Sequence, residues 1–485
     1  MGVKNNKPTR TITHSFKWVF LTTIVRRALS FLLFLYIVRV FSRAEIGSYR
    51  TFFLILSFST LISSFSFNFL NIVEKTKKYI KVGMQFVLIS SVFISIILFL
   101  LRGILSEKYG SFDLYMYILY GFWLVIPLTF KKIIRSLYEL DMDFKFLSIT
   151  ETIKVIFYVL LALLLFLIDL KYYYFIIAFF LGEIVELVIL YYPIRKKLAM
   201  ALLGSLKLKF LKPLNRVLKE KFSFLCFSTI PTALNLFVSE APILLMGLFF
   251  LPEFIGNYFV AAQLVTVPVS FLTISLSQIL FPAFSLTEKE HLPQKIDEYI
   301  KHVVFVLWIP ILILGVLLKH WSFLIIGNHE INLVISIVSL LTLKTLIVMI
   351  LNPLSSIPTV FKKPQYELYW SICYMTAVCG MILLFRNFSF LNMIYLYVTV
   401  SILSLIAFIV MILKMVDLPI KNFVFSLWKG TVYTFPLISL LFLPQTVKTT
   451  TSMLFLLLSI LYSVTMLYIF ERKFFIVFFK RMLLS

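Results

Sequence analysis

Residues 41–49 of the chain read Phe-Ser-Arg-Ala-Glu-Ile-Gly-Ser-Tyr, and residues 250–258 read Phe-Leu-Pro-Glu-Phe-Ile-Gly-Asn-Tyr. Phe, Ile, Gly and Tyr stand in the same register in both stretches, although glycine is rare, with only 14 of 485 residues. Six long apolar runs separate the second copy from the first. An even number of membrane crossings between two copies predicts two repeated halves that run through a bilayer in the same direction.

The composition places the chain among integral membrane proteins. It is 61% hydrophobic and 14% charged, with a mean hydropathy of +1.00, which is outside the range of soluble domains. Apolar runs of about 20 residues recur along it, and each is long enough to cross a bilayer as a helix but too uniformly apolar for a barrel strand. We predict fourteen spans: 16–41, 47–72, 82–104, 113–137, 149–170, 172–194, 222–250, 255–284, 299–326, 331–357, 366–386, 389–415, 426–443 and 451–478.

These spans predict an all-α integral membrane fold of two parallel six-helix lobes followed by a further helix pair. The expected domains are the first lobe at 1–194, a linker at 195–221, the second lobe at 222–415 and the helix pair at 416–485. The linker is basic, and its leucines and phenylalanines alternate with lysines, as in an amphipathic helix on an anionic cytoplasmic leaflet. It serves either as a tether between moving lobes or only to fix the topology.

The distribution of charge supports this topology and argues against nucleic acid as a partner. The chain has 46 Lys and Arg against 22 Asp and Glu, a net charge of +24. About 33 of these basic residues fall in loops on the side of the N-terminus and about 8 on the other side, which is the positive-inside pattern. We therefore expect both termini in the cytoplasm.

The sequence gives no sign of catalysis or of a metal site. Cys226, Cys373 and Cys379 all fall within expected spans, without the spacing of a metal site or a disulfide framework. The loops on the outer side are very short, for instance around Arg386-Asn387. Because a catalytic constellation needs supporting structure around it, we expect a protein that is not an enzyme.

Two adjacent arginines lie deep in the first expected span. Arg26 and Arg27 stand about 12–15 Å along the helix from its cytoplasmic start, near the middle of the bilayer. Thr22, Thr23 and Ser30 flank them at helical spacings and complete a polar stripe. Arginine stays charged and binds phosphate through two parallel hydrogen bonds, so a buried pair suits a diphosphate. The stripe favours a substrate site of Arg26, Arg27, Thr23 and Ser30, with a structural ion-pair network as the alternative.

Charges of both signs in the fifth and sixth expected spans predict an ion pair within the first lobe. Lys154 lies in the cytoplasmic third of the fifth span, and Glu183 and Glu186 lie in the sixth. Glu186 has the same depth as Lys154 if the two helices are antiparallel neighbours. Ionised groups in a bilayer are costly unless they are paired or face water, so we expect a structural salt bridge here.

Two more polar positions fall in the second lobe. Lys344 lies near the middle of the tenth span without an obvious local partner, which favours a cation that faces a cavity and binds substrate. Glu240 follows Asn235 in the seventh span. We expect Glu240 and Asn235 to supply a counter-charge or an ion-coupling site.

Several stretches resemble one known family. Residues 247–258, 260–264 and 278–285, with Pro268 between them, resemble the seventh-to-eighth-span signature of bacterial polysaccharide flippases. These are O-antigen and capsule repeat-unit translocases of the multidrug/oligosaccharidyl-lipid/polysaccharide exporter superfamily. Residues 39–49 are similar to the end of span one in that family. Its members often carry an acidic residue where Glu240 stands, and the related lipid II flippases have a cavity arginine where Arg27 falls.

The resemblance implies a MATE-like fold and a flippase that works by alternating access. Such a protein would move undecaprenyl-diphosphate-linked oligosaccharide from the cytoplasmic to the outer leaflet of the bacterial inner membrane, for O-antigen, capsule or lipopolysaccharide synthesis. Membrane lipids, a polysaccharide polymerase and chain-length machinery are the further partners expected. No cofactor is expected, and coupling to H⁺, Na⁺ or the membrane potential is left open. The alternatives are a lipid II-type precursor flippase, a drug/cation antiporter of the same superfamily, and a membrane-embedded glycan polymerase.

Overall fold

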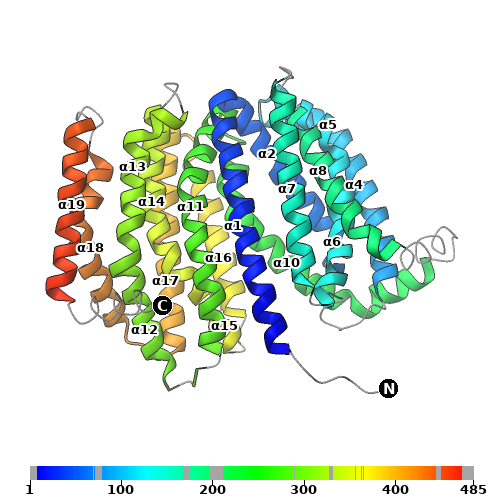
Figure 1. The fold of residues 1–485 in the computed structure, drawn as a ribbon. Helices are drawn as coiled ribbons and strands as arrows, with labels where there is room; N and C mark the ends of the chain where they lie inside the picture. The colour runs from blue at the N-terminus through cyan, green and yellow to red at the C-terminus, as the bar shows by residue number, and fades with distance from the viewer. Residues whose placement is uncertain are drawn as a thin grey trace. The chain divides into compact units, whose positions relative to one another are not determined.

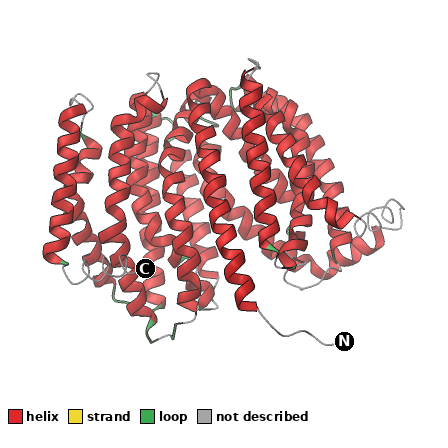
Figure 2. Ribbon diagram, viewed as in Figure 1, coloured by secondary structure: helices red, strands yellow, loops and turns green. Residues whose placement is uncertain are grey.

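The computed structural model describes residues 8–68, 70, 79–141, 143–167, 174–195, 211–285, 287–288, 290–326, 331–355, 357–361, 363, 365–443 and 449–471. Throughout these residues the regular structure is helical, and they contain no strand (Figure 2). The chain divides into two compact units, Met1–Gly256 and Asn257–Ser485. The expected lobes at 1–194 and 222–415 and the helix pair at 416–485 stay predictions, and residues 196–210 of the expected linker lie outside the described residues.

The first unit is built mainly from long helices (Figure 1). Helix α1 packs along α7, α7 packs along α8, and α2 lies against α4, α5, α6 and α10. The 3-10 segment η1 (Phe122–Leu124) joins α5 to α6, and η2 (Tyr192–Ile194) follows α8. The helices are α1 (Pro8–Val40), α2 (Arg43–Ser64), α4 (Ile80–Lys108), α5 (Phe112–Gly121), α6 (Val125–Leu140), α7 (Phe144–Leu167), α8 (Tyr174–Tyr191) and α10 (Leu211–Met246).

The second unit is centred on α14, which packs against α13 and α17, while α18 packs against α13 and α19. A π-helical turn, η4 (Val303–Leu307), joins α12 to α13 just before Pro310, which accommodates a ring that would clash in a regular helix. Helix α11 (Pro252–Ser285) begins in the first unit and continues into the second at Asn257. The other helices are α12 (Leu292–His302), α13 (Trp308–Ile326), α14 (Ile331–Leu354), α15 (Ile357–Val360), α16 (Gln365–Leu384), α17 (Phe390–Met415), α18 (Ile420–Phe442) and α19 (Thr449–Phe470).

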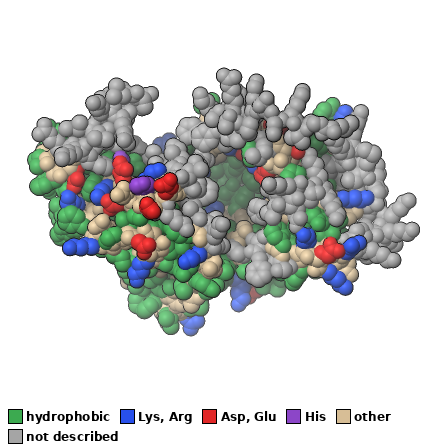
Figure 3. Space-filling model, turned by 90° about the horizontal axis from the view of Figure 1, so that it is seen from below, with side chains coloured by type: hydrophobic (Ala, Val, Ile, Leu, Met, Phe, Trp, Pro, Cys, Tyr) green, Lys and Arg blue, Asp and Glu red, His purple; other side chains and the backbone are tan. Residues whose placement is uncertain are grey.

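The described residues include 13 helices that are long and apolar enough to cross a membrane. They match every expected span except 222–250, which α10 (Leu211–Met246) covers as far as residue 246. Large apolar side chains cover the outside of the helices, as Leu454, Leu457 and Leu461 of α19 illustrate with exposed fractions of 58, 64 and 64%. Seen from below, charged side chains gather at the helix ends among hydrophobic ones (Figure 3). The chain is a multi-pass membrane protein.

The repeated motif forms the start of a helix in both copies. In the first copy, Ser42 caps α2: its Oγ accepts a hydrogen bond from the N–H of Glu45 at 3.3 Å, and its own N–H donates to the Glu45 carboxylate at 2.7 Å. In the second copy, Pro252 is the first residue of α11, a position where the missing N–H would have no helical partner anyway. Helix α2 therefore begins at Arg43 rather than at the predicted residue 47, because the cap and not the apolar run sets the start.

The glycines of the motif lie where these two helix starts meet, within the first unit. A Cβ added to Gly47 would overlap the carbonyl oxygen of Pro252, and one added to Gly256 would overlap the carbonyl oxygen of Arg43. Each of those carbonyls lies four residues before the opposite glycine in the motif, so the contact is reciprocal. Only glycine lets two backbones approach so closely, which explains why both copies keep it in register.

Candidate functional site

Helix α1 is held to α7 by polar contacts from its predicted stripe. The Thr22 hydroxyl hydrogen-bonds the Ser148 hydroxyl, and Arg26 forms an ion pair with Glu151. Arg26 also donates to Thr23 Oγ1 at 2.9 Å. Thr22 and Arg26 stand four residues apart on α1, and Ser148 and Glu151 stand three apart on α7, so each pair occupies one helix face. The sequence left a binding site and an ion-pair network open for Arg26, and the structure gives its guanidinium a carboxylate partner.

Helices α6, α7 and α8 each add two charged side chains to this cluster. Lys154 Nζ of α7 lies 3.0 Å from carboxylates of both Glu183 and Glu186 on α8. Lys131 Nζ of α6 lies 2.9 Å from Glu186 and also pairs with Glu183. Arg135, one turn further along α6, pairs with Glu151 and lies 3.5 Å from Glu186. The cluster therefore connects four helices of the first unit.

Burial divides the cluster into two parts. Lys131, Glu183 and Glu186, which we name the buried charge group, have side chains exposed by only 9, 2 and 0%. The other part is the accessible charge group, whose side chains are exposed by 18–27%: Arg26, Arg135, Glu151 and Lys154. Together the two groups contain four cations and three carboxylates. Glu139, which lies 3.9 Å from Arg135 on α6, is a fourth carboxylate beside them, so the charges of the cluster balance.

The structure thus brings Lys154, Glu183 and Glu186 together. Sequence reasoning missed Lys131 and Arg135, which fall near the end of the expected span 113–137, and gave Glu151 no partner. A signal was available, because each of α6, α7 and α8 carries its two charges three or four residues apart, on one helix face. Such a pattern on three consecutive spans indicates a shared polar interior.

The remaining predicted residues of α1 lie beside this cluster. Arg27 is partly buried, and Ser30 is exposed on the surface of the first unit. Their assignment to substrate binding stays a prediction.

Glu240 of α10 has a partner in the first unit that the sequence did not identify. Arg50 Nη2 of α2 lies 2.7 Å from both carboxylate oxygens of Glu240, and both side chains are about four-fifths buried. The Arg50 guanidinium therefore ties α2 to α10. The side chain of Asn235 lies outside the described residues, so the proposed coupling site of Glu240 and Asn235 stays a prediction.

Lys344 of α14, in the second unit, is bound by aromatic groups. Its Nζ donates to the Tyr397 hydroxyl of α17 at 2.5 Å and lies 4.5 Å from the centre of that ring. The neighbouring Tyr374 and Ser401 hydroxyls are 2.8 Å apart. Among the described residues, no salt bridge reaches Lys344. A cation held by a phenol instead of a carboxylate has no opposite charge that an incoming anion must displace, which is compatible with the predicted binding role.

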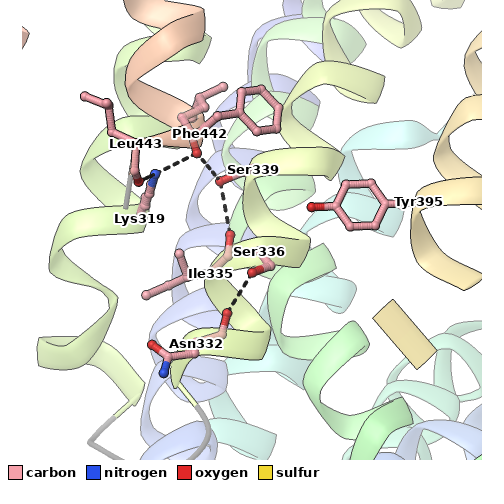
Figure 4. A pocket seen from close by; sticks show the side chains of 9 residues that line it. Lys319, Asn332, Ile335, Ser336, Ser339, Tyr395, Phe442 and Leu443 are labelled. Atoms are coloured by element: carbon pink, nitrogen blue, oxygen red, sulfur yellow. Dashed lines mark hydrogen bonds between the residues drawn. The ribbon is translucent and has the colours of Figure 1, made fainter. Parts of the chain in front are cut away.

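A second lysine of that unit has a structural task that the sequence did not reveal. Lys319 of α13 is 4% exposed, and its Nζ donates to the carbonyl oxygens of Leu440, Leu441 and Leu443 at 3.1, 2.7 and 2.5 Å (Figure 4). These carbonyls form the carboxyl end of α18, which a cation stabilises. Ser339 of α14 donates to the same Leu441 carbonyl at 2.9 Å. Lys319 and Ser339 both line a cavity of about 330 Å³.

Comparisons with known proteins agree with this architecture. A family profile described as "Polysaccharide biosynthesis protein" matches residues 36–329. The chain is similar to a solved structure of the lipid II flippase MurJ in an inward closed conformation, with a TM-score of 0.70, 13% identity, and coverage of 94% of this chain and 99% of that one. It is also similar to an inward-facing multidrug resistance MATE family transporter of the MOP superfamily, with a TM-score of 0.55, 11% identity, and coverage of 85% and 96%. No curated protein matches the chain at a significant level. The two structural likenesses bear on the fold.

Proposed function

This chain belongs to the family of polysaccharide biosynthesis proteins, and from that membership we propose that it flips undecaprenyl-diphosphate-linked oligosaccharide repeat units across the bacterial inner membrane. The units would move from the cytoplasmic to the outer leaflet by alternating access, for O-antigen or capsule synthesis. The observation that carries the proposal is the accessible charge group, where Arg26 and Arg135 from two helices meet at Glu151. Guanidinium groups that converge within membrane helices suit a lipid whose head is a diphosphate.

Each part of the substrate has a proposed place. Arg26 and Arg27, with Thr23 and Ser30, would hold the diphosphate, since guanidinium groups bind phosphate oxygens in pairs. Lys344, held by Tyr397, would supply a second cation on the other unit, and the prenyl tail would stay in lipid. Membrane potential, negative inside, would assist the outward movement of an anionic head by about 2.3 kcal/mol per charge per 100 mV.

Further parts of the proposal concern coupling, partners and orientation. Glu240 and Asn235 would form a coupling site for H⁺ or Na⁺, in which Arg50 competes with the ion for the Glu240 carboxylate. Both termini would lie in the cytoplasm, as the positive-inside pattern predicts. A polysaccharide polymerase and its chain-length machinery would receive the flipped unit. The protein itself would make and break no covalent bond.

The structural likeness to MurJ favours one second candidate, a lipid II-type precursor flippase. Both candidate substrates present a prenyl diphosphate, so the same cations serve either. Deletion of the gene separates them. Accumulation of undecaprenyl-linked oligosaccharide repeat units on the cytoplasmic leaflet, with loss of surface polysaccharide, is expected for the first candidate. Accumulation of peptidoglycan precursor with cell lysis would establish the second, and normal levels of both lipids would refute both.

A further inference from the structure

Glu151 holds a special position in the accessible charge group, because it is the carboxylate that joins two arginines from different helices. One of its oxygens pairs with Arg26 of α1 and the other with Arg135 of α6. Its own helix, α7, packs between these partners, contacting both α1 and α6. Two guanidinium groups that converge on one anion make the geometry of a phosphate site. Here the protein fills that place with its own carboxylate.

The two carboxylates of the buried charge group are held differently. Glu183 and Glu186 each pair with both Lys131 and Lys154, and their exposed fractions of 2 and 0% leave no approach for a ligand. Glu151 and Arg26 are each 18% exposed. Ionised side chains of membrane helices avoid hydrocarbon, so the exposed edge of this pair faces water or other protein groups. An incoming anion therefore has access to Glu151 and its arginines, but not to Glu183 and Glu186.

We propose that Glu151 is an internal counter-ion that occupies the diphosphate position in the empty protein and is displaced when the substrate binds. This inference rests on the proposed function and deepens it. A diphosphate carries a charge on each phosphate, so it can take over both guanidinium groups that Glu151 bridges. The displaced carboxylate stays nearby on α7 and competes for the arginines again. Glu151 thereby weakens substrate binding and favours release on the far side of the membrane.

The inference is tested by the affinity of the full-length, detergent-purified protein for farnesyl diphosphate, measured by calorimetry. The variant Glu151→Gln keeps the size and the hydrogen-bonding capacity of the side chain but removes its charge. We expect it to bind farnesyl diphosphate roughly fivefold more tightly than the unaltered protein, the effect of removing one partly exposed competing charge. Glu139→Gln is the matched control, because Glu139 is 31% exposed and lies 3.9 Å from the same Arg135, but it does not bridge two helices. We expect its affinity to stay within about twofold.

Unchanged or weaker binding of farnesyl diphosphate by Glu151→Gln overturns the inference. An equal gain in affinity in Glu139→Gln also overturns it. So does the absence of binding by both the unaltered protein and Glu151→Gln. If Glu151→Gln does not fold, Glu151→Asp provides the test. Aspartate is one methylene group shorter, so its carboxylate lies further from the two arginines, and we expect binding to tighten by a smaller factor. These outcomes are distinct from failure of the proposed function. That failure would be normal lipid-linked oligosaccharide in the deletion strain, whatever the affinity of the variants.

Discussion

Arg27 is the residue for which the proposed site makes its simplest prediction. Replacing it by alanine removes a group that would bind the diphosphate through charge-assisted hydrogen bonds, each worth about 1.5–3 kcal/mol. We expect Arg27→Ala to lose most surface polysaccharide, with transport reduced by roughly tenfold or more, while the amount of protein in the membrane stays normal. Immunoblots of the glycan and of the protein measure both quantities.

The matched control for this residue is Arg386→Ala, which removes an arginine from an exposed turn of the second unit. It should leave the glycan unchanged. Arg27→Lys separates charge from geometry, because lysine keeps the charge but cannot form the paired hydrogen bonds of a guanidinium; an intermediate glycan level is expected. Glycan at the level of the unaltered protein in Arg27→Ala would remove this residue from the site.

At the same scale, depth along a helix predicted only part of the charge cluster. It located Lys154, Glu183 and Glu186, because each interrupts an apolar run that must lie in the membrane. It missed Lys131 and Arg135, because the fourth run ends at 137 and basic residues near such an end are normally solvated. Their burial depends on α6 continuing to Leu140 and packing against α7 and α8. The periodicity of the sequence does not predict such packing between helices.

At the scale of elements, the crossing of α2 and α11 makes a sharp prediction about Gly47. A methyl group there would meet the Pro252 carbonyl oxygen, and a backbone atom cannot rotate away as a flexible side chain can. Overpacking of this kind costs about 1–3 kcal/mol. We expect Gly47→Ala and Gly256→Ala each to lower the melting temperature of the detergent-purified protein.

Gly103→Ala is the control for these two variants. An added Cβ at Gly103 in α4 has no heavy atom within 4 Å, so alanine should be neutral or should stabilise the helix by up to about 1 kcal/mol. A Gly47→Ala variant as stable as Gly103→Ala would contradict the close approach. The sequence repeat pointed to these glycines, but which carbonyl each one accommodates required the structure.

The attachment of α18 to the second unit depends on Lys319. Replacing it by methionine keeps most of the apolar length but removes the donor to the Leu440 and Leu443 carbonyl groups and leaves the Leu441 carbonyl with Ser339 alone. Buried groups left unsatisfied cost about 1–3 kcal/mol each. We expect Lys319→Met to lower the melting temperature and to make the region after α18 susceptible to limited proteolysis. Lys414→Met, at an exposed position near the end of α17, should change neither, and equal behaviour of the two variants would contradict the anchoring role.

Lys319 also shows why element ends are hard to predict from sequence. Near the end of an apolar run, lysine normally extends its side chain to water, and nothing local distinguishes such a residue from a helix anchor. The span itself was predicted correctly because about 20 apolar residues suffice to identify one. The beginning of α1 at Pro8, ahead of the predicted residue 16, has the same cause: a helix can extend beyond its apolar segment into water.

For the molecule as a whole, the proposed transport of an anionic lipid head predicts dependence on membrane potential. Two charges moved across 100 mV gain about 4.6 kcal/mol, and a barrier that senses half of this changes the rate by roughly tenfold or more. In proteoliposomes, a potassium diffusion potential set with valinomycin, negative on the side where the lipid-linked oligosaccharide starts, should therefore accelerate its translocation. The label accessible to an impermeant reagent on the opposite side measures the rate.

The controls for this prediction separate potential from ion coupling. In vesicles with equal potassium on both sides, valinomycin generates no potential, which controls for valinomycin itself. Protein-free vesicles give the uncatalysed rate of translocation. A translocation rate that does not depend on the potential but rises with a sodium or proton gradient would mean that a co-transported cation neutralises the diphosphate during the crossing. Glu240→Gln should then abolish the gradient dependence, since Glu240 carries the carboxylate proposed for coupling. Arg50, its partner at 2.7 Å, would in that case be the group that the coupling cation displaces.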